Sequence, residues 1–296
     1  MTANSPASPA DPIIVRRIRR VLGRVLVYAL IFLLCSFILL PVAWMLTAAL
    51  KPDLTPILTM EPEWFPTKYF DWNNFVRILT LESQPFLRFA INTVVLAGFN
   101  IVATVASCSL VAFAFARMRF RFSGPLFYLL IITMLIPWQA LIIPQFLAFH
   151  AIGWYGTYLP LIVPAFGANA FFVFLIRQYM RTIPRELDDA ARIDGASWFQ
   201  IFRHVVLPLS KPVLAVVVVF TFIGRWNDLL GPLLYLNTTN DFTVPIGLAN
   251  LAGRAGNAQY NLLMAANFLS ILPPAVIYFI IQKQLIGGIA SVGLKG

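Results

Sequence analysis

A stretch of 55 consecutive residues, 122–176, contains no aspartate, glutamate, lysine or arginine. A helix needs about 20 mostly apolar residues to cross the hydrocarbon core of a bilayer, so this stretch is too long for one crossing and has the length of two. Its only turn-like segment is HAIGWYGT, residues 150–157, which we expect to connect the two crossings. A chain with such a stretch is typical of proteins that cross a membrane several times.

Apolar runs on either side of this stretch bring the number of expected crossings to six. One of them carries two ionisable residues, Arg225 and Asp228. The expected spans are residues 25–50, 89–116, 123–149, 158–176, 212–236 and 258–282. We therefore predict an all-α polytopic membrane protein with six transmembrane helices in residues 25–286. Residues 1–24 form a partly disordered N-terminal tail in this prediction, and residues 287–296 form a C-terminal tail.

The composition excludes a water-soluble globule. Hydrophobic residues make up 59% of the chain, charged residues make up 11%, and the mean hydropathy is +0.80. Soluble domains carry roughly 25% charged residues, so this chain cannot cover a soluble surface. Although the net charge is +10, the basic residues are spread over short segments between the apolar runs, which argues against a nucleic-acid-binding protein.

The basic residues also predict how the chain is oriented. Lys and Arg accumulate on the cytoplasmic side of membrane proteins. The segments 1–24, 117–121, 177–211 and 283–296 carry 16 of them, whereas the alternate segments 51–88, 150–157 and 237–254 carry 5. We therefore expect both termini and the long segment 177–211 to lie in the cytoplasm.

The chain lacks the residue patterns of a catalytic, metal or nucleotide site. Cys35 and Cys108 lie inside apolar runs, which excludes a disulfide framework and a zinc site, and His150 and His204 are far apart. None of the five lysines follows a glycine, so there is no phosphate-binding loop of the Gly-Lys-Ser/Thr type. We expect no catalytic residue, no metal and no cofactor bound by this chain. If ATP drives the protein, another chain hydrolyses it.

Segment 177–211 predicts two short helices joined by a tight turn. Pro184 suits the first turn of a helix, and the acidic residues that follow it suit the positive N-terminal end. Gly195 can adopt the positive φ that ends this helix, and Ser197 with Gln200 matches a capping box that begins the second. The second helix has one apolar stripe, formed by Trp198, Ile201, Phe202, Val205 and Val206. Periodicity alone leaves open whether this pair of helices meets a partner or only anchors the segment to the membrane surface.

The residues of this segment resemble the signature loop of binding-protein-dependent ABC importer permeases. The matching run is Asp189-Ala190-Ala191-Arg192-Ile193-Asp194-Gly195-Ala196, followed by Ile201-Phe202 and Leu207-Pro208-Leu209. It differs at Asp189, where the family pattern has glutamate. The rest of the chain is similar to the second permease subunit of the maltose-type, carbohydrate-importing subgroup. That similarity rests on Asn92-Thr93, Ala112 to Arg117, Arg225 to Asp228, and the tail from Gly287 to Gly296.

The resemblance implies a type I ABC importer permease fold with segment 184–212 as a coupling loop. The residues expected to couple to a separate ATPase are Asp188, Asp189, Ala190, Ala191, Arg192, Asp194, Gly195, Ala196 and Phe202. The implied partners are a related permease in a heterodimer, two cytoplasmic ATPases that bind ATP and Mg, and an extracytoplasmic solute-binding protein. The implied substrate is a sugar or oligosaccharide, moved across the cell (inner or plasma) membrane. A polyol or a glycerol phosphate ester is the alternative.

The ionisable residues of the fifth span leave two interpretations open. Arg225 and Asp228 can neutralise each other as a structural i, i+3 pair, or they can line the substrate path. Trp226 and Asn227 are residue types that stack on and hydrogen-bond a sugar, although a tryptophan can equally anchor a span at the interface. Six spans with a polar pair would also suit a secondary transporter, but Asp228 is the only acid within a span. The absence of paired catalytic groups disfavours a membrane-embedded enzyme.

Overall fold

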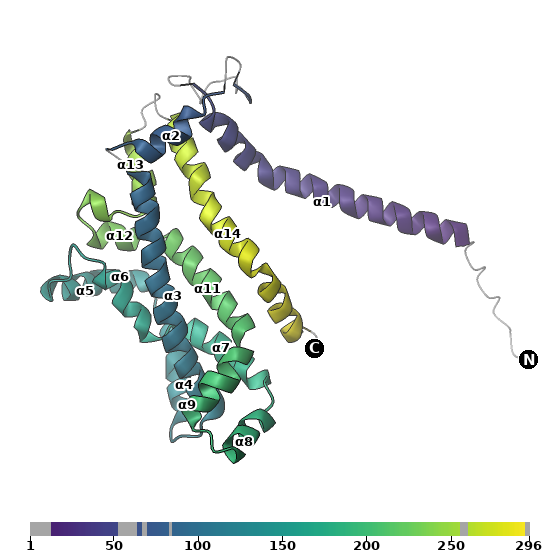
Figure 1. Ribbon diagram of the computed structural model, residues 1–296, viewed down its shortest axis with the longest axis vertical. Coiled ribbons are helices and arrows are strands. Elements are labelled where there is room, and N and C mark those ends of the chain that lie inside the picture. Colours follow the sequence, from purple (N-terminus) through teal and green to yellow (C-terminus); the bar gives the residue numbers. More distant parts are fainter. Residues whose placement is uncertain (1–12, 53–63, 67–69, 83–84, 255–259, 294–296) are drawn as a thin grey trace, which may run out of the picture.

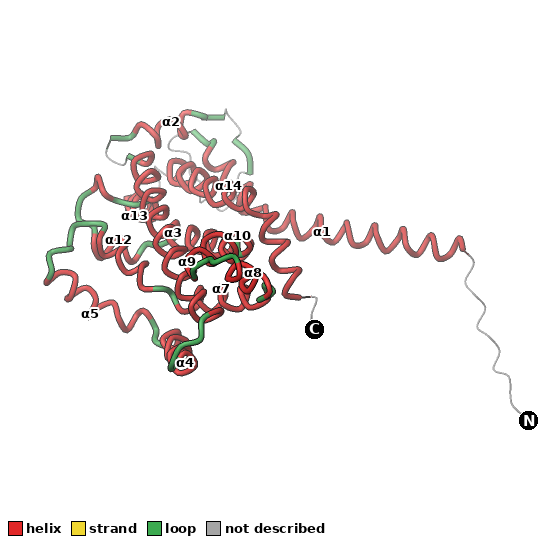
Figure 2. The backbone as a smooth tube through the Cα atoms, turned by 60° about the horizontal axis from the view of Figure 1, so that its bottom comes forward, coloured by secondary structure: helices red, strands yellow, loops and turns green. Residues whose placement is uncertain are grey.

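The computed structural model describes residues 13–52, 64–66, 70–82, 85–254 and 260–293. Within these ranges the regular secondary structure is helical throughout, as predicted (Figure 2). Residues 1–12 and 294–296 of the two expected tails lie outside the described residues. The rest of both tails is helical, because the first helix begins at Ile13 and the last continues to Gly293.

Among the described residues, four helical segments are long and apolar enough to cross a membrane. Two bent pairs of helices meet the same criterion together, which brings the number of spans to six if each pair counts as one. The four unbroken spans are Val21–Ala49, Phe86–Arg117, Leu159–Thr182 and Tyr260–Gln284. The helices that contain them are α1 (Ile13–Ala49), α3 (Phe86–Arg117), α6 (Leu159–Ile162) with η2 (Val163–Gly167) and α7 (Ala170–Thr182), and α14 (Tyr260–Gly293).

The first bent pair occupies the expected span 123–149. It turns by 94° between Leu135 and Trp138. Ile136 adopts an extended conformation with ψ 113°, because a residue before proline is disfavoured in a helix and Pro137 follows it. The parts are α4 (Ser123–Ile132), η1 (Thr133–Leu135) and α5 (Trp138–Ala151).

The second bent pair differs from the expected fifth span at both ends. Its helix α11 ends at Trp226, and a separate helix begins at Leu230, so residues 212–236 are not one helix. Before α11, the chain turns by 77° and is helical back to Trp198. The parts in order are α9 (Trp198–Ile201), the π-helical η3 (Phe202–Val206), α10 (Leu207–Leu209), α11 (Lys211–Trp226) and α12 (Leu230–Tyr235).

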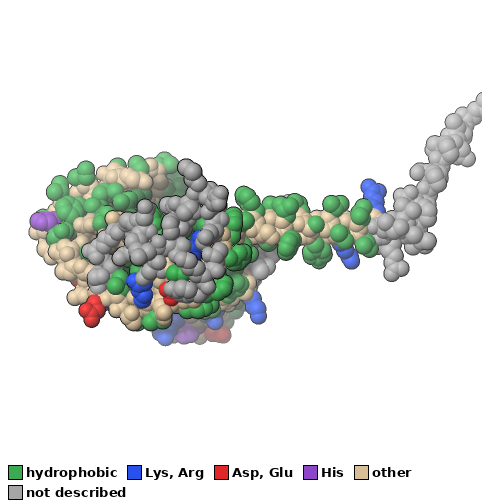
Figure 3. All heavy atoms as spheres, turned by 90° about the horizontal axis from the view of Figure 1, so that it is seen from above, with side chains coloured by type: hydrophobic (Ala, Val, Ile, Leu, Met, Phe, Trp, Pro, Cys, Tyr) green, Lys and Arg blue, Asp and Glu red, His purple; other side chains and the backbone are tan. Residues whose placement is uncertain are grey.

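Helix α3 runs through the length of the body (Figure 1). Helices α2 and α13 lie at one end of it, here called the α2 end, and helices α8 and α9 lie at the other, here called the α8 end. Helix α1 leaves the body near α2 and extends away from it, and none of its apolar window is buried. Apolar side chains cover this helix on the face shown in Figure 3. The remaining elements are α2 (Asn73–Thr80), α8 (Glu186–Ile193), η4 (Thr239–Asp241) and α13 (Val244–Arg254).

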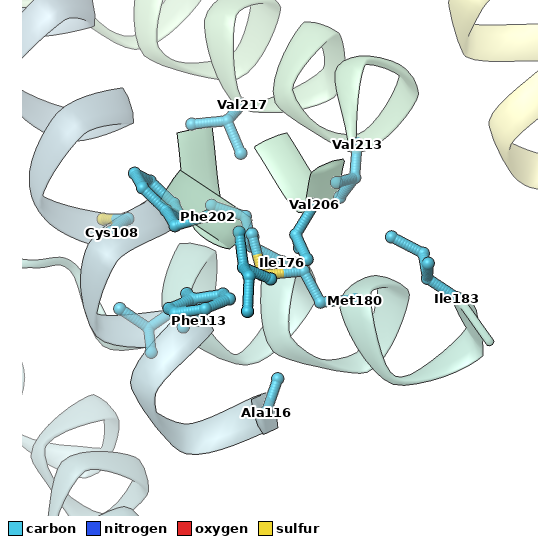
Figure 4. Close-up of a cluster of buried hydrophobic side chains, with 13 residues drawn as sticks. Cys108, Phe113, Ala116, Ile176, Met180, Ile183, Phe202, Val206, Val213 and Val217 are labelled. Atoms are coloured by element: carbon cyan, nitrogen blue, oxygen red, sulfur yellow. The ribbon is translucent and has the colours of Figure 1, made fainter. Parts of the chain in front are cut away.

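The apolar core nearest the α8 end joins this end to the spans. Figure 4 shows side chains of α3, α7, η3 and α11 that converge on one another. Phe113 of α3 meets Phe202 of η3 with ring centroids 5.2 Å apart. The fully buried members are Cys108, Ala112, Val173, Ile176, Met180, Ile201, Val206 and Val217. The position of the α8 end is thereby fixed to α3, α7 and α11.

Candidate functional site

The α8 end is built from two short helices and a tight turn. Helix α8 begins at Glu186, two residues later than Pro184 suggested, and its first turn carries the three expected acids. It ends before Asp194, and Gly195 follows with φ +83°. This conformation favours glycine, so the predicted role of Gly195 as the terminating residue is confirmed.

The predicted capping box begins the second helix. The backbone N–H of Gln200 donates to Ser197 Oγ at 3.4 Å, and the backbone N–H of Ser197 donates to Gln200 Oε1 at 2.7 Å. The apolar stripe after it packs into the core, where Ile201, Phe202 and Val206 are buried. Trp198 and Val205 pack against the same core, so all five residues of the predicted stripe face it, although residues 202–206 are π-helical and not α-helical.

The outer surface of this end is a corner with a hollow between α8 and α9. The hollow has a volume of about 300 Å³, and its lining includes Asp194, Gly195 and Gln200. Beside it, Ile193 is 87% exposed, the most exposed large apolar side chain of the described residues. The sequence analysis did not select Ile193 as a site residue. A large aliphatic residue two positions before the turn glycine, in an otherwise polar corner, was the signal that could have found it.

The predicted coupling residues divide into an outward set and an inward set. Asp189, Ala190, Arg192, Asp194 and Gly195 are exposed, and Ala191 and Ala196 are half-buried. Phe202 and Asp188 point inward: both are buried, so neither offers its side chain to a partner at this surface. That Asp188 and Phe202 belong to the coupling residues remains a prediction, and any part they play lies in contacts within this chain.

Asp188 forms a buried ion pair with the last residue of α3. Its Oδ2 lies 3.2 Å from Arg117 Nε, and the two side chains are 7% and 1% exposed. Burial raises the pKa of the Asp188 carboxyl, and the positive charge of Arg117 opposes that rise. Sequence spacing could not pair these residues, because they lie 71 positions apart.

The second candidate site lies at the end of α11, where Arg225 and Asp228 form the predicted i, i+3 pair. Arg225 Nη1 donates to Asp228 Oδ2 at 3.1 Å, and Asp228 Oδ1 accepts the backbone N–H of Gly231 at 3.0 Å. Asp228 therefore has a structural role at the start of α12. Arg225 also lines two cavities, one of about 440 Å³ between α3, α7 and α11, and one of about 160 Å³ next to α5 and α12. The pair can therefore have a structural role and also line the substrate path.

Trp226 does not face either cavity. It is 3% exposed, its Nε1 donates to the Ser270 carbonyl of α14 at 2.9 Å, and its ring stacks on Phe222. The side chain therefore joins α11 to α14 and is available neither to stack on a sugar nor to anchor the span at an interface. Asn227 is exposed, and its amide donates to the Ile223 carbonyl at 3.0 Å.

Membrane-crossing helices, a cavity between them that Arg225, Asn169 and two threonines help to line, and an exposed two-helix corner at one end are typical of membrane transport subunits. The profile of the family described as "Binding-protein-dependent transport system inner membrane component" matches residues 109–290. The chain is 32% identical over 277 residues to the arabinooligosaccharides transport system permease protein AraQ of Bacillus subtilis (strain 168), covering 90% of this chain and 94% of that protein. It is 36% identical over 221 residues to the sn-glycerol-3-phosphate transport system permease protein UgpE of Salmonella typhi, covering 74% and 77%.

A solved structure agrees with this fold. A crystal structure of a bacterial ABC transporter involved in the import of the acidic polysaccharide alginate contains a chain that superposes with a TM-score of 0.77 at 24% identity, covering 94% of this chain and all of that one. The chain belongs to the family of binding-protein-dependent transport system inner membrane components. It is a permease subunit of an ABC importer and not a catalytic enzyme, so the sequence resemblance is confirmed.

Proposed function

We propose that this permease moves a carbohydrate, a sugar or an oligosaccharide, into the cytoplasm and is driven by ATP hydrolysis on separate ATPase subunits that dock on the α8 end. The observation that carries the docking is the exposed corner itself. Ile193 is exposed to solvent next to a residue that lines a hollow of about 300 Å³, and two exposed aspartates, Asp189 and Asp194, lie close to it in the sequence. A partner with an apolar contact and basic side chains would fit this surface. Small residues at Ala190 and Gly195 allow its backbone to come close.

The carbohydrate is supported by the relatives and by the chemistry of the larger cavity. Thr221 lines this cavity with a buried hydroxyl oxygen that has no hydrogen-bond partner, and Arg225 and Asn169 line it as well. Such groups suit a solute rich in hydroxyl groups. We place Arg225, Asn227 and Asp228 on the substrate path and leave Trp226 out of it.

A glycerol phosphate ester is the second candidate substrate. One relative is named for the transport of sn-glycerol-3-phosphate. Arg225 favours this candidate, because a guanidinium binds phosphate oxygens through paired, charge-assisted hydrogen bonds. Because the chain belongs to a family of ABC importer permeases, we do not propose the two alternatives from the sequence, a secondary transporter and a membrane-embedded enzyme.

The proposed assembly follows from the docking of the ATPases at the α8 end. The permease pairs with a related permease, two ATPases that hold ATP and Mg bind at the cytoplasmic α8 end, and a solute-binding protein delivers the substrate at the opposite, α2 end. Helix α14 runs from the α2 end toward the α8 end (Figure 1), which supports a cytoplasmic location for the C-terminus, and we propose the same location for the N-terminus from its basic residues. The exposed apolar surface of α1 is suited to lipid or to the second permease.

The substitution Ile193→Asp tests the docking. We expect it to abolish co-purification of the ATPase subunits and ATP-driven uptake into proteoliposomes, because it places a charge where an apolar contact is needed. Ile152→Asp makes the same change at an exposed isoleucine in the segment between α5 and α6 and should leave co-purification intact. ATPase binding that survives Ile193→Asp unchanged would contradict the proposed docking surface. Uptake of labelled arabinooligosaccharide and of labelled sn-glycerol 3-phosphate by the same vesicles separates the two substrates.

A further inference from the structure

Helix α8 is attached to the body through very little buried surface. Asp188 is its only buried residue, whereas the neighbouring segment α9–η3 is attached by the apolar core. A force applied to the exposed corner therefore reaches the spans along two routes. One is the apolar core, on which η3 and Ala191 of α8 pack, and the other is a set of polar contacts from the start of α8 to the end of α3, made by Arg185 and Asp188.

Asp188 connects α8 to α3 through one arginine. Arg117 is the last residue of α3, and its Nε lies 3.2 Å from Asp188 Oδ2. The same guanidinium donates from Nη2 to the Ile183 carbonyl at 3.0 Å, and this bond is buried. Ile183 ends α7, so a single planar side chain holds the end of α7 and the first turn of α8 at once.

The end of α3 also accepts hydrogen bonds from arginines of the neighbouring helices. Arg185, at the start of α8, donates from Nη2 to the Ala116 carbonyl at 3.4 Å, and Arg177 of α7 donates from Nε to the Phe115 carbonyl at 3.2 Å. These carbonyls belong to the last turn of α3, which has no partners inside the helix and carries a partial negative charge. Three arginines thus link α3, α7 and α8.

Stability alone does not account for a charged pair at this position. Removing two charges from water costs several kcal/mol per ion, and well-packed apolar residues often stabilise such a site equally well or better. Apolar contacts, however, are non-directional, whereas two buried charges are strongly penalised when they separate, because each is then left without its partner. The arrangement suits the transfer of movement better than it suits simple cohesion.

We propose that Arg117 and Asp188 are positioning residues for ATP-driven transport, which form the joint that carries movement of α8 to α3. Thr104 lies on α3 in the wall of the larger cavity, so a displacement of α3 changes the shape of that cavity. This inference rests on the proposed docking of an ATPase at the α8 end. It adds that the force reaches the substrate cavity through a specific buried ion pair.

The test uses the permease assembled with its partner permease, ATPases and solute-binding protein in proteoliposomes. Asp188→Asn removes the anion, and the double variant Arg117→Met with Asp188→Leu removes both charges and leaves neither unpaired. We expect both variants to hydrolyse ATP while the solute taken up per ATP falls about fivefold or more, the lower limit of typical coupling between two sites. Glu186→Gln neutralises an exposed acid of the same helix turn and should leave this ratio unchanged. Arg117→Lys keeps the positive charge but loses the planar guanidinium. We expect its uptake of solute per ATP to lie between those of the wild type and of the variants that remove a charge.

Two other results would overturn the proposal. If ATP hydrolysis, uptake and the amount of assembled complex fall in proportion, the pair is only structural. If the double variant transports with the wild-type ratio, the joint does not need the ion pair. Failure of the proposed function is visible separately, because the wild-type vesicles would then show uptake that does not depend on the ATPase subunits.

Discussion

The two ends of helix α3 are held by different chemistry. At the α8 end, Arg117 forms a buried ion pair with Asp188 and a bond to a backbone carbonyl. At the α2 end, the contacts shielded from solvent are neutral: Thr93 Oγ1 accepts the backbone N–H of Val244 at 2.9 Å, and Asn92 donates to the Phe242 carbonyl at 3.0 Å. One end is therefore fixed by neutral hydrogen bonds to the segment before α13 and to α13, while the other combines a buried ion pair with hydrogen bonds from arginines to backbone carbonyls.

The largest expected effect is the loss of one charge at the α8 end. Asp188→Ala leaves the Arg117 guanidinium buried without a neighbouring anion. Because a guanidinium cannot lose its proton in a protein, we expect the free energy of unfolding to fall by about 3–5 kcal/mol. Arg117→Met should cost less, because Asp188 can take up a proton and become neutral. The thermal unfolding midpoint of the detergent-solubilised complex measures both. Equal midpoints for these two variants would mean that the guanidinium is not confined as the structure has it.

A smaller effect is expected at the α2 end. Thr93→Val keeps the shape of the side chain but removes the acceptor for the buried N–H of Val244, at a cost of about 1–3 kcal/mol. Thr93→Ser keeps the hydroxyl group and serves as the matched control. The thermal unfolding midpoint again measures the effect. If Thr93→Val lowers the midpoint as much as Asp188→Ala does, the two ends of α3 do not differ in the way we infer.

The smallest effect is expected at an exposed contact of the α2 end. Arg88 donates from Nε to the Asn240 carbonyl at 3.0 Å in an exposed position. Arg88→Gln should change the stability by no more than about 0.5 kcal/mol, as is usual for surface residues. Uptake by the reconstituted complex should also be unchanged. A large loss of uptake with an unchanged midpoint would instead assign Arg88 to the binding of another protein.

The sequence predicted the features that depend on local chemistry. The turn at Gly195 and the capping box of Ser197 and Gln200 follow from residues within four positions of one another, and the structure has both. The apolar runs predicted helices because a bilayer demands about 20 apolar residues for each crossing. The Arg225–Asp228 pair could likewise be predicted from the sequence, since the two residues lie about one helical turn apart.

Features that depend on distant residues were not predictable in the same way. Nothing near Asp188 indicates that it faces Arg117, and nothing near Trp226 indicates that it bonds to α14. The ends of the spans were misplaced for a related reason. An uncharged run tells how much chain is apolar, but the 94° turn before Trp138 and the end of α11 at Trp226 are set by a proline and by contacts with neighbouring helices.

The separation of α1 from the rest of the body has a consequence for how such subunits diversify. None of the apolar window of this helix contributes to the buried interior, so most of its residues are under no packing constraint from their own chain. Substitutions along it would leave the two cavities and both ends of α3 intact. The first helix can therefore adapt to a different neighbour or a thicker bilayer while the transport machinery stays the same.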